Sequence, residues 1–203
     1  RLKRFEEAEK NAKIALDYYR MFAKQFPDKY DEYVALGLRL LSEIQAERGA
    51  YNDSEKGYKE AWKIYQSLIN DNPDKYLLDV VRTLQGLARL QIHLKHYPLS
   101  IDAINNALII YQDVNHNQSN AYSPNLIQLK AELSSMLDYT GSFKEAIDNW
   151  REVLSYYEEC AKGNEDFLPE KAITLYNLAI ALWHYKQYEE AETNFIDAWN
   201  IFK

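Results

Sequence analysis

Apolar residues recur at three- and four-residue intervals along nearly the whole chain, which is the spacing of one face of an α-helix. The stretch 51–96 shows this most clearly. It contains a segment rich in charged and aromatic residues, a break at Pro73, and a leucine-rich second segment. We find no convincing strand pattern. The sequence therefore predicts an all-α fold, with helices near 2–26, 29–48, 51–71, 74–95, 97–116, 121–140, 143–162, 168–185 and 188–203.

The helix pair at 51–96 recurs along the chain. Its opening aromatic residue, Tyr51, has counterparts at Phe5, Tyr97, Phe143 and Tyr188, so the steps are 46, 46, 46 and 45 residues. A fixed period of this size is typical of a solenoid, in which each repeat packs on its neighbours. The polar junction at 115–120 lacks the proline of the first two junctions, and we expect it to be the most mobile loop.

Each repeat places side chains of similar size at the same distances from its opening aromatic residue. Positions 3 and 10 residues on are small or slim, and positions 7, 11 and 14 are mostly large and apolar. These positions share one helix face, where small residues let a neighbouring helix approach and large ones fill the core. We assign to the core the aromatic residues at position 14, which are Tyr19, Tyr65, Tyr111, Tyr157 and Phe202.

A second pattern precedes the opening aromatic residue: two leucines three apart and then a small residue, as in Leu84, Leu87 and Ala88. Gly49 and Gly141 mark a tight turn after it. This order resembles the tetratricopeptide repeat, although the unit is longer than the usual length of about 34 residues. Such long repeats resemble those of kinesin light chains and of bacterial multidomain regulators. The resemblance implies a right-handed superhelical solenoid of antiparallel helix pairs, whose repeats bind peptides or hold neighbouring domains.

The period divides residues 1–203 into about four and a half repeats of one solenoid. The approximate units are 1–27, 28–73, 74–120, 121–166 and 167–203. The chain opens with Arg1 rather than Met, midway through a repeat, and we interpret it as a fragment of a longer chain. Apolar residues at 195–202 then predict either further repeats or an end-to-end homodimer.

Charge and composition narrow the classes of partner. The net charge of −7 argues against wrapping nucleic acid or binding an anionic membrane surface. No run of about 18 apolar residues is present, so we expect no direct membrane insertion. Cys160 is the single cysteine and cannot form an internal disulfide, which favours a reducing, cytoplasmic location, although an earlier signal segment stays possible.

The usual signatures of catalysis and of cofactor binding are missing. His93 and His96 are three residues apart on a helix, but no third metal ligand follows at a useful spacing. Carboxylate pairs such as Glu158 and Glu159 fall on polar faces near helix ends. No glycine-rich phosphate loop or nucleophile elbow occurs. We therefore expect no metal, no cofactor and no enzyme activity from this segment.

The candidate binding groove lies on the first helix of each pair, on the face away from the second helix. In tetratricopeptide arrays this face lines a channel that holds an extended peptide. Positions 15, 12, 8 and 4 before the opening aromatic residue supply the candidates. They are Arg39, Glu43, Arg82, Gln85, Arg89, His93, Tyr139, Tyr176, Ile180 and His184, with Trp183 beside the last row. The groove therefore changes from charged to aromatic along the chain.

The charged part of the groove has two interpretations. Arg82, Arg89 and His93 form a stripe that could attract an acidic peptide, whereas Glu43 and Glu47 could instead pair with Arg89 and His93. The terminal-carboxylate clamp known from relatives that bind heat-shock-protein tails has no match here.

The sequence favours a non-catalytic scaffold that binds a peptide or protein segment. Two alternatives stay open: a sensor or assembly arm of a multidomain regulator with intramolecular contacts, and an accessory repeat domain of an enzyme whose catalytic domain lies elsewhere.

Overall fold

The structure is a computed structural model that describes residues 2–115 and 123–203, with side chains described from Phe5 to Val114 and from Ser123 onward. Every regular element in these ranges is helical, so the predicted all-α fold is confirmed there. The helices are α1 (Leu2–Ala23), α2 (Pro27–Glu47), α3 (Tyr51–Asp71), α4 (Pro73–His93), α5 (Tyr97–Asn115), α6 (Pro124–Thr140), α7 (Phe143–Gly163), α8 (Leu168–His184) and α9 (Tyr188–Phe202), with a 3₁₀ turn at Glu165–Phe167. The junction predicted to be mobile lies, except for Asn115, outside the described residues.

Prolines set where the first helices begin. Pro27 and Pro73 occupy the first position of α2 and α4, where the missing N–H of proline would have no helical partner anyway. The residues before them, Phe26 and Asn72, take non-helical backbone angles with φ of −139° and −145°, because proline disfavours a helical neighbour. These two helices therefore begin slightly earlier than predicted. The side chain of Asn72 also caps α4 by accepting from the N–H of Lys75 at 3.2 Å.

Four turns join a first helix to a second helix through a residue in the left-handed conformation. These residues are Gly49 (φ 80°), Lys95 (φ 61°), Gly141 (φ 88°) and Lys186 (φ 67°). In each turn, the left-handed residue donates its N–H to the carbonyl three residues back, and the next residue donates to the carbonyl five residues back. All eight N···O distances lie between 2.8 and 3.1 Å. This is the Schellman arrangement, and the sequence showed it only at the two glycines.

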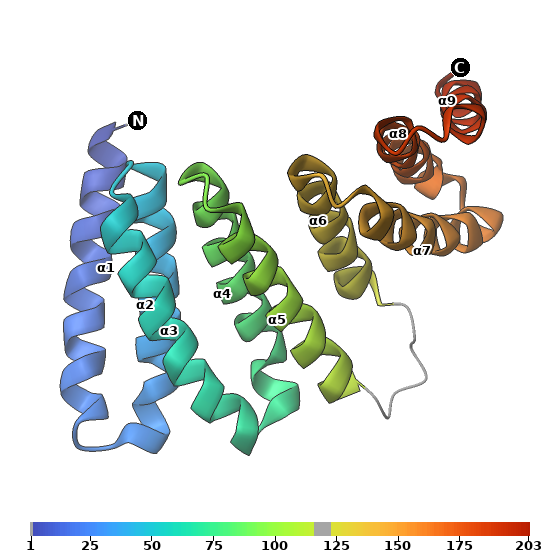
Figure 1. Cartoon of the computed structure of the whole chain (residues 1–203). Helices are drawn as coiled ribbons and strands as arrows, with labels where there is room; N and C mark the ends of the chain where they lie inside the picture. The colour runs from blue at the N-terminus through green and yellow to red at the C-terminus, as the bar shows by residue number, and fades with distance from the viewer. Residues whose placement is uncertain (1, 116–122) are drawn as a thin grey trace. The chain divides into compact units, whose positions relative to one another are not determined.

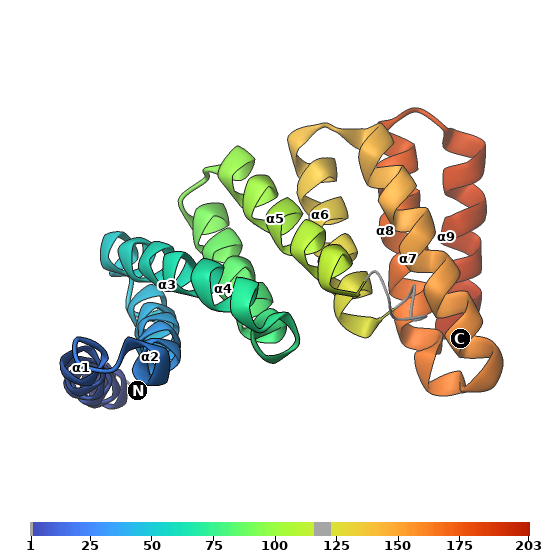
Figure 2. The same ribbon diagram turned by 90° about the horizontal axis from the view of Figure 1, so that it is seen from below.

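The chain forms two compact units, residues 1–117 and 118–203, and each is described by itself. In the first unit, α1 to α5 follow one another and each helix packs against the next (Figure 1). The first helices α2 and α4 also contact each other. In the second unit, α7 packs against α6 and α8, and α8 packs against α9 (Figure 2). The single solenoid and its repeat boundaries remain a prediction.

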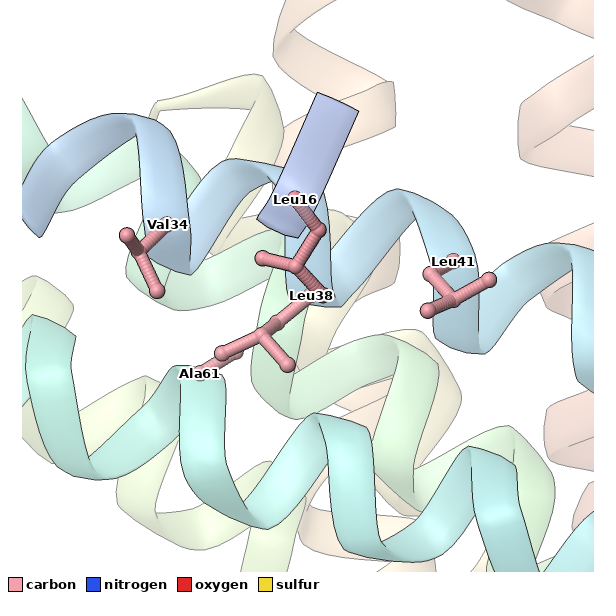
Figure 3. Close-up of a cluster of buried hydrophobic side chains, with 5 residues drawn as sticks. All are labelled: Leu16, Val34, Leu38, Leu41 and Ala61. Carbon is pink, nitrogen blue, oxygen red and sulfur yellow. The ribbon is translucent and has the colours of Figure 1, made fainter. Parts of the chain in front are cut away.

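The core of the first unit follows the register read from the sequence. Leu16 of α1, Leu38 of α2 and Ala61 of α3 meet in one buried cluster with Val34 and Leu41 (Figure 3). Burying a leucine of this kind contributes about 1.5–3 kcal/mol. The methyl group of Ala61 is fully buried, so the small residue at position 10 does allow a close helix approach.

The aromatic residues at position 14 divide into three groups. Tyr65 and Tyr111 are buried as predicted, at 1% and 7% exposure. Tyr19 and Tyr157 are half-buried, and Tyr19 stacks on Tyr33 of α2 with ring centroids 5.4 Å apart. The core assignment is wrong for Phe202, which is 56% exposed, because no described helix packs on that side of α9.

Candidate functional site

The six charged and polar groove candidates of the first unit gather around one hollow of about 470 Å³. These residues are Arg39 and Glu43 from α2 and Arg82, Gln85, Arg89 and His93 from α4. They converge because α2 and α4 contact each other, while residues three and four apart on each helix share one face. The structure therefore brings these six side chains around one space, and their role in binding remains a prediction.

Arg39 holds the α2 side of the hollow. It is 8% exposed, and its Nη1 donates to Oε1 of Glu43 at 2.6 Å. Its Nη2 also lies 3.8 Å from Oδ1 of Asp79 on α4. A buried guanidinium needs such partners to offset its lost hydration, yet its Nε atom has no hydrogen-bond acceptor in the described part of the chain. The Arg39–Glu43 pair was not predicted above, although the spacing of four residues on one helix indicates it.

Tyr58 of α3 also contributes to the wall of the hollow and is 3% exposed. Its ring lies against Gly86 of α4, where an added Cβ atom would be only 2.5 Å from the ring. Glycine is therefore required for this close approach. Burial raises the pKa of Tyr58, and the neighbouring carboxylate of Glu43 raises it further, so the phenol stays protonated.

Cationic side chains occupy the α4 side of the hollow. Arg82 and Arg89 are both exposed and lie seven residues apart, which is about 10 Å along a helix. Arg82 makes no ion pair with any other described residue. The ring of His93 stacks on Tyr51 at a centroid distance of 6.2 Å. Because Glu43 is paired with Arg39, the acidic side of the hollow is already partly neutralised from within α2.

The second unit has its own hollow of about 290 Å³, on the corresponding faces of its helices. It is lined by Gln128, Ala131, Glu132 and Ser135 of α6, by Trp150, Val153 and Tyr157 of α7, and by Glu170, Ile173, Thr174 and Asn177 of α8. Four of these residues, Gln128, Ala131, Ser135 and Ile173, stand at the groove positions 15, 12 and 8 before the opening aromatic residue, although they are not among the candidates named above. Trp150 and Tyr157 were assigned only to the core, at positions 7 and 14 of the repeat. Both side chains nevertheless line the hollow.

The five groove candidates in the second unit lie outside that hollow. Tyr139 is 66% exposed, Tyr176 is 50% exposed and Ile180 is half-buried. Trp183 is 56% exposed and makes an edge contact with Tyr188, with centroids 5.0 Å apart. The imidazole of His184 lies with Nδ1 3.0 Å from Oδ1 of Asp138 and packs on the ring of Phe143, at 5.2 Å. Tyr139 lies on α6 and the other four lie on α8, and none of the five lines the hollow.

No cluster of three or more His, Cys, Asp or Glu side chains in the described parts of the chain could hold a metal ion. None of the helices there combines the length and the apolar character needed to span a bilayer.

Comparison with known proteins identifies the fold. No family model matches the sequence. No curated protein matches it either. Solved structures do match: a Podosopora anserina putative kinesin light chain with nearly identical TPR-like repeats has a TM-score of 0.68 at 12% identity, covering 98% of this chain and 92% of that one. BtubC (BKLC) from P. vanneervenii has a TM-score of 0.57 at 16% identity, covering 97% and 90%.

YrrB, described as a TPR protein with an unusual peptide-binding site, has a TM-score of 0.57 at 14% identity, covering 96% of this chain and 80% of that one. The fold is thus the TPR-like helical repeat fold, as the sequence predicted. At these identities the likeness concerns the fold alone.

Proposed function

We propose that this chain is a non-catalytic protein-interaction scaffold that binds a peptide or protein segment along its first helices. The observation that supports this most directly is the hollow of the first unit, where side chains from two successive first helices face a common space. One structural neighbour, YrrB, carries a peptide-binding site on the same fold. The proposal transfers to this chain only the kind of ligand, a peptide, and not its identity.

The chemistry of that hollow favours an acidic peptide. Arg82 and Arg89 are exposed residues of α4, and Glu43 is paired with Arg39. A guanidinium binds a carboxylate through charge-assisted hydrogen bonds, which are stronger than neutral ones. Two acidic side chains of one extended peptide could reach both arginines, because their spacing of about 10 Å equals about three residues of extended chain. The peptide would therefore be fixed in position at two points.

A selection from a displayed peptide library against the purified chain tests the scaffold function. We expect enrichment of peptides with at least two acidic residues, measured afterwards by fluorescence anisotropy of synthetic copies. The double variant Arg82→Glu with Arg89→Glu should weaken their binding at least about tenfold, because each charge-assisted bond contributes about 1.5–3 kcal/mol.

A matched control reverses two exposed lysines elsewhere in the first unit. Lys56 and Lys63 of α3 are exposed and do not line the hollow, so Lys56→Glu with Lys63→Glu changes the net charge equally. This control should bind nearly as the original chain does. A selection that enriches no binding peptide would contradict the scaffold function, and equal losses in both double variants would contradict the assignment to this hollow.

A further inference from the structure

Aromatic side chains form an uncovered face on α9 and on α8 beside it (Figure 2). On α9 they stand at the opening position and at positions 7, 11 and 14 of the repeat, which share one side of the helix, and they are Tyr188, Phe195, Trp199 and Phe202. Three of them are exposed, and Phe195 is half-buried. Tyr176 and Trp183 of α8 extend this face, since their rings make edge contacts with two of these side chains, at centroid distances of 5.5 and 5.0 Å. The ring of Trp199 is 62% exposed although the ammonium of Lys203 lies 5.9 Å from its centre.

The same positions of α3 are covered by α4 in the first unit. The ring of Tyr58, at position 7, lies against Gly86. Tyr65, at position 14, is buried, and its ring centroid lies 6.5 Å from that of Tyr76 on α4. Both α3 and α9 are aromatic at all four positions, with tryptophan at position 11 in each. In its residue types, α9 therefore presents the surface on which α4 packs in the first unit.

A glutamate at position 4 of the second helices takes part in the same packing. Glu9 of α1 accepts a hydrogen bond from Arg48, which directly follows α2. Glu55 of α3 accepts from the amide of Gln91, in the last turn of α4, at 3.0 Å. In both pairs the donor comes from the C-terminal end of the first helix that packs on the glutamate.

Glu192 of α9 stands at the same position without such a donor. A lysine four residues on pairs with the glutamate in α1 and in α3, whereas α9 has Ile196 there. Glu192 is exposed and makes no ion pair with any other described residue. A helix docked on α9 therefore needs a donor near its C-terminal end, and a cation suits Glu192 best because it also supplies the missing counter-charge.

We propose that the aromatic face of α8 and α9 docks an amphipathic helix of a protein partner, in the position that α4 takes on α3. The docked helix has a small residue opposite Phe195, as α4 has Gly86 opposite Tyr58. Five residues later, where α4 has Gln91, it has an arginine or lysine that binds Glu192. This face lies in the second unit and belongs to neither hollow, so the inference is independent of the peptide site proposed above.

An extended peptide is the competing occupant, and the apolar character of the face argues against it. The aromatic positions from Tyr188 to Phe202 extend over about 21 Å of helix. An extended chain laid on these rings would bury N–H and C=O groups without partners, which costs free energy. A helix satisfies those groups internally and offers one apolar side to the rings. The length of the face also matches the central part of a helix such as α4, which has 21 residues.

The test uses a labelled peptide that copies residues 72–96 of this chain, which contain α4, and measures its fluorescence anisotropy with the purified chain. We expect the peptide to bind, and Trp199→Ala to weaken binding at least about tenfold, as removal of a central aromatic residue from an interface does. The control Ile109→Ala removes an exposed apolar side chain from α5 and should bind as the original chain does. Gly86→Leu in the peptide raises its helix propensity, yet it should weaken binding at least about tenfold because leucine meets the ring of Phe195.

A second comparison tests the charge at Glu192. The peptide with Gln91→Arg should bind at least about threefold more tightly than the original peptide, because Glu192 gains a cationic partner. Glu192→Gln in the chain should remove this difference between the two peptides. The control Asp197→Asn removes one charge from an exposed position that the helical period puts on the other side of α9, and the difference should persist there.

Each contrary outcome overturns the inference for a different reason. Absence of peptide binding, or equal binding to Trp199→Ala, would show that this face does not dock such a helix. A preference for the Gln91→Arg peptide that survives Glu192→Gln would show attraction to overall negative charge only. A chain that sediments as a dimer, and as a monomer after Trp199→Ala, would assign the face to a second copy of the chain. None of these outcomes bears on the hollow of the first unit, whose acidic peptides are tested through Arg82 and Arg89.

Discussion

Replacing Gly86 by alanine tests the close approach of α4 to Tyr58, on which the shape of the charged hollow depends. A methyl group built on Gly86 would lie 2.5 Å from Cε1 and 2.6 Å from both Cζ and Oη of Tyr58. Non-bonded carbon atoms settle at about 3.5–4.0 Å, so the ring or the helix must move by about 1 Å. Tyr58 is 3% exposed and cannot turn into solvent without losing its burial.

The expected magnitude combines two opposing effects. Over-packing a well-filled site costs about 1–3 kcal/mol. Alanine is more stable than glycine inside a helix by about 0.5–1 kcal/mol, which offsets part of that loss. We therefore expect Gly86→Ala to lower the free energy of unfolding by about 1–2 kcal/mol. Urea unfolding followed by circular dichroism measures this difference, with the same dependence of the free energy on urea concentration used for both chains.

The same substitution in a Tyr58→Leu background supplies the control. Leucine removes the phenol ring that the methyl group would strike, so Gly86→Ala should there stabilise the chain by up to about 1 kcal/mol. The change of sign corresponds to a coupling energy of about 2 kcal/mol between the two positions. If Gly86→Ala stabilises the original chain as much as the Tyr58→Leu background, then α3 and α4 do not approach as closely as described.

Two further predictions concern a turn and an interhelical ion pair. Lys95 has φ of 61°, a conformation that is strained for residues with a Cβ atom. Lys95→Gly should therefore raise the free energy of unfolding by about 0.5–1 kcal/mol, measured by urea unfolding. A lower free energy of unfolding in this variant would contradict the prediction. Hydrogen bonding to Lys75, with a smaller contribution from Tyr76, holds the pKa of Glu32 below its ordinary value of 4.5. The ionised carboxylate therefore stabilises the fold above pH 4.5, and this stabilisation is lost as the pH falls through the lowered pKa. The stability difference between the original chain and Glu32→Gln should therefore shrink on acidification below about pH 4.5, and an unchanged difference would refute the linkage.

The fold could be predicted from the sequence because residues of similar size recur at the same position of each repeat. A small residue such as Ala61 and a large one such as Tyr65 occupy such positions, and both lie on the buried face of their helix. The exposure of Phe202 could not be read in the same way. Burial of that position depends on a helix packed over it, and the local pattern is the same whether or not such a helix is present.

The two hollows differ in how far the sequence could predict them. In the first unit, the positions on α2 and α4 follow from helix geometry alone, and Arg39 and Arg82 lie where the register placed them. The contact of Arg39 with Asp79 depends on the distance between α2 and α4, and the repeat period gives no information about that distance. In the second unit, Ala131 and Ser135 line the hollow together with Trp150, and a period that records side-chain size does not measure the space between them.

The tight turns with left-handed residues have a consequence for how the chain folds. Each turn closes its hydrogen bonds within six residues, and the helices it joins then contact each other along their length. Within each unit, helices pack mainly on their neighbours in the chain, and the contact of α2 with α4 reaches only across one intervening helix. Chains whose contacts are this local close short loops first and fold in microseconds to milliseconds. Folding can therefore begin at any helical hairpin and spread to the next. A substitution that slows the formation of one turn, at Lys95 for example, delays that hairpin without blocking the others.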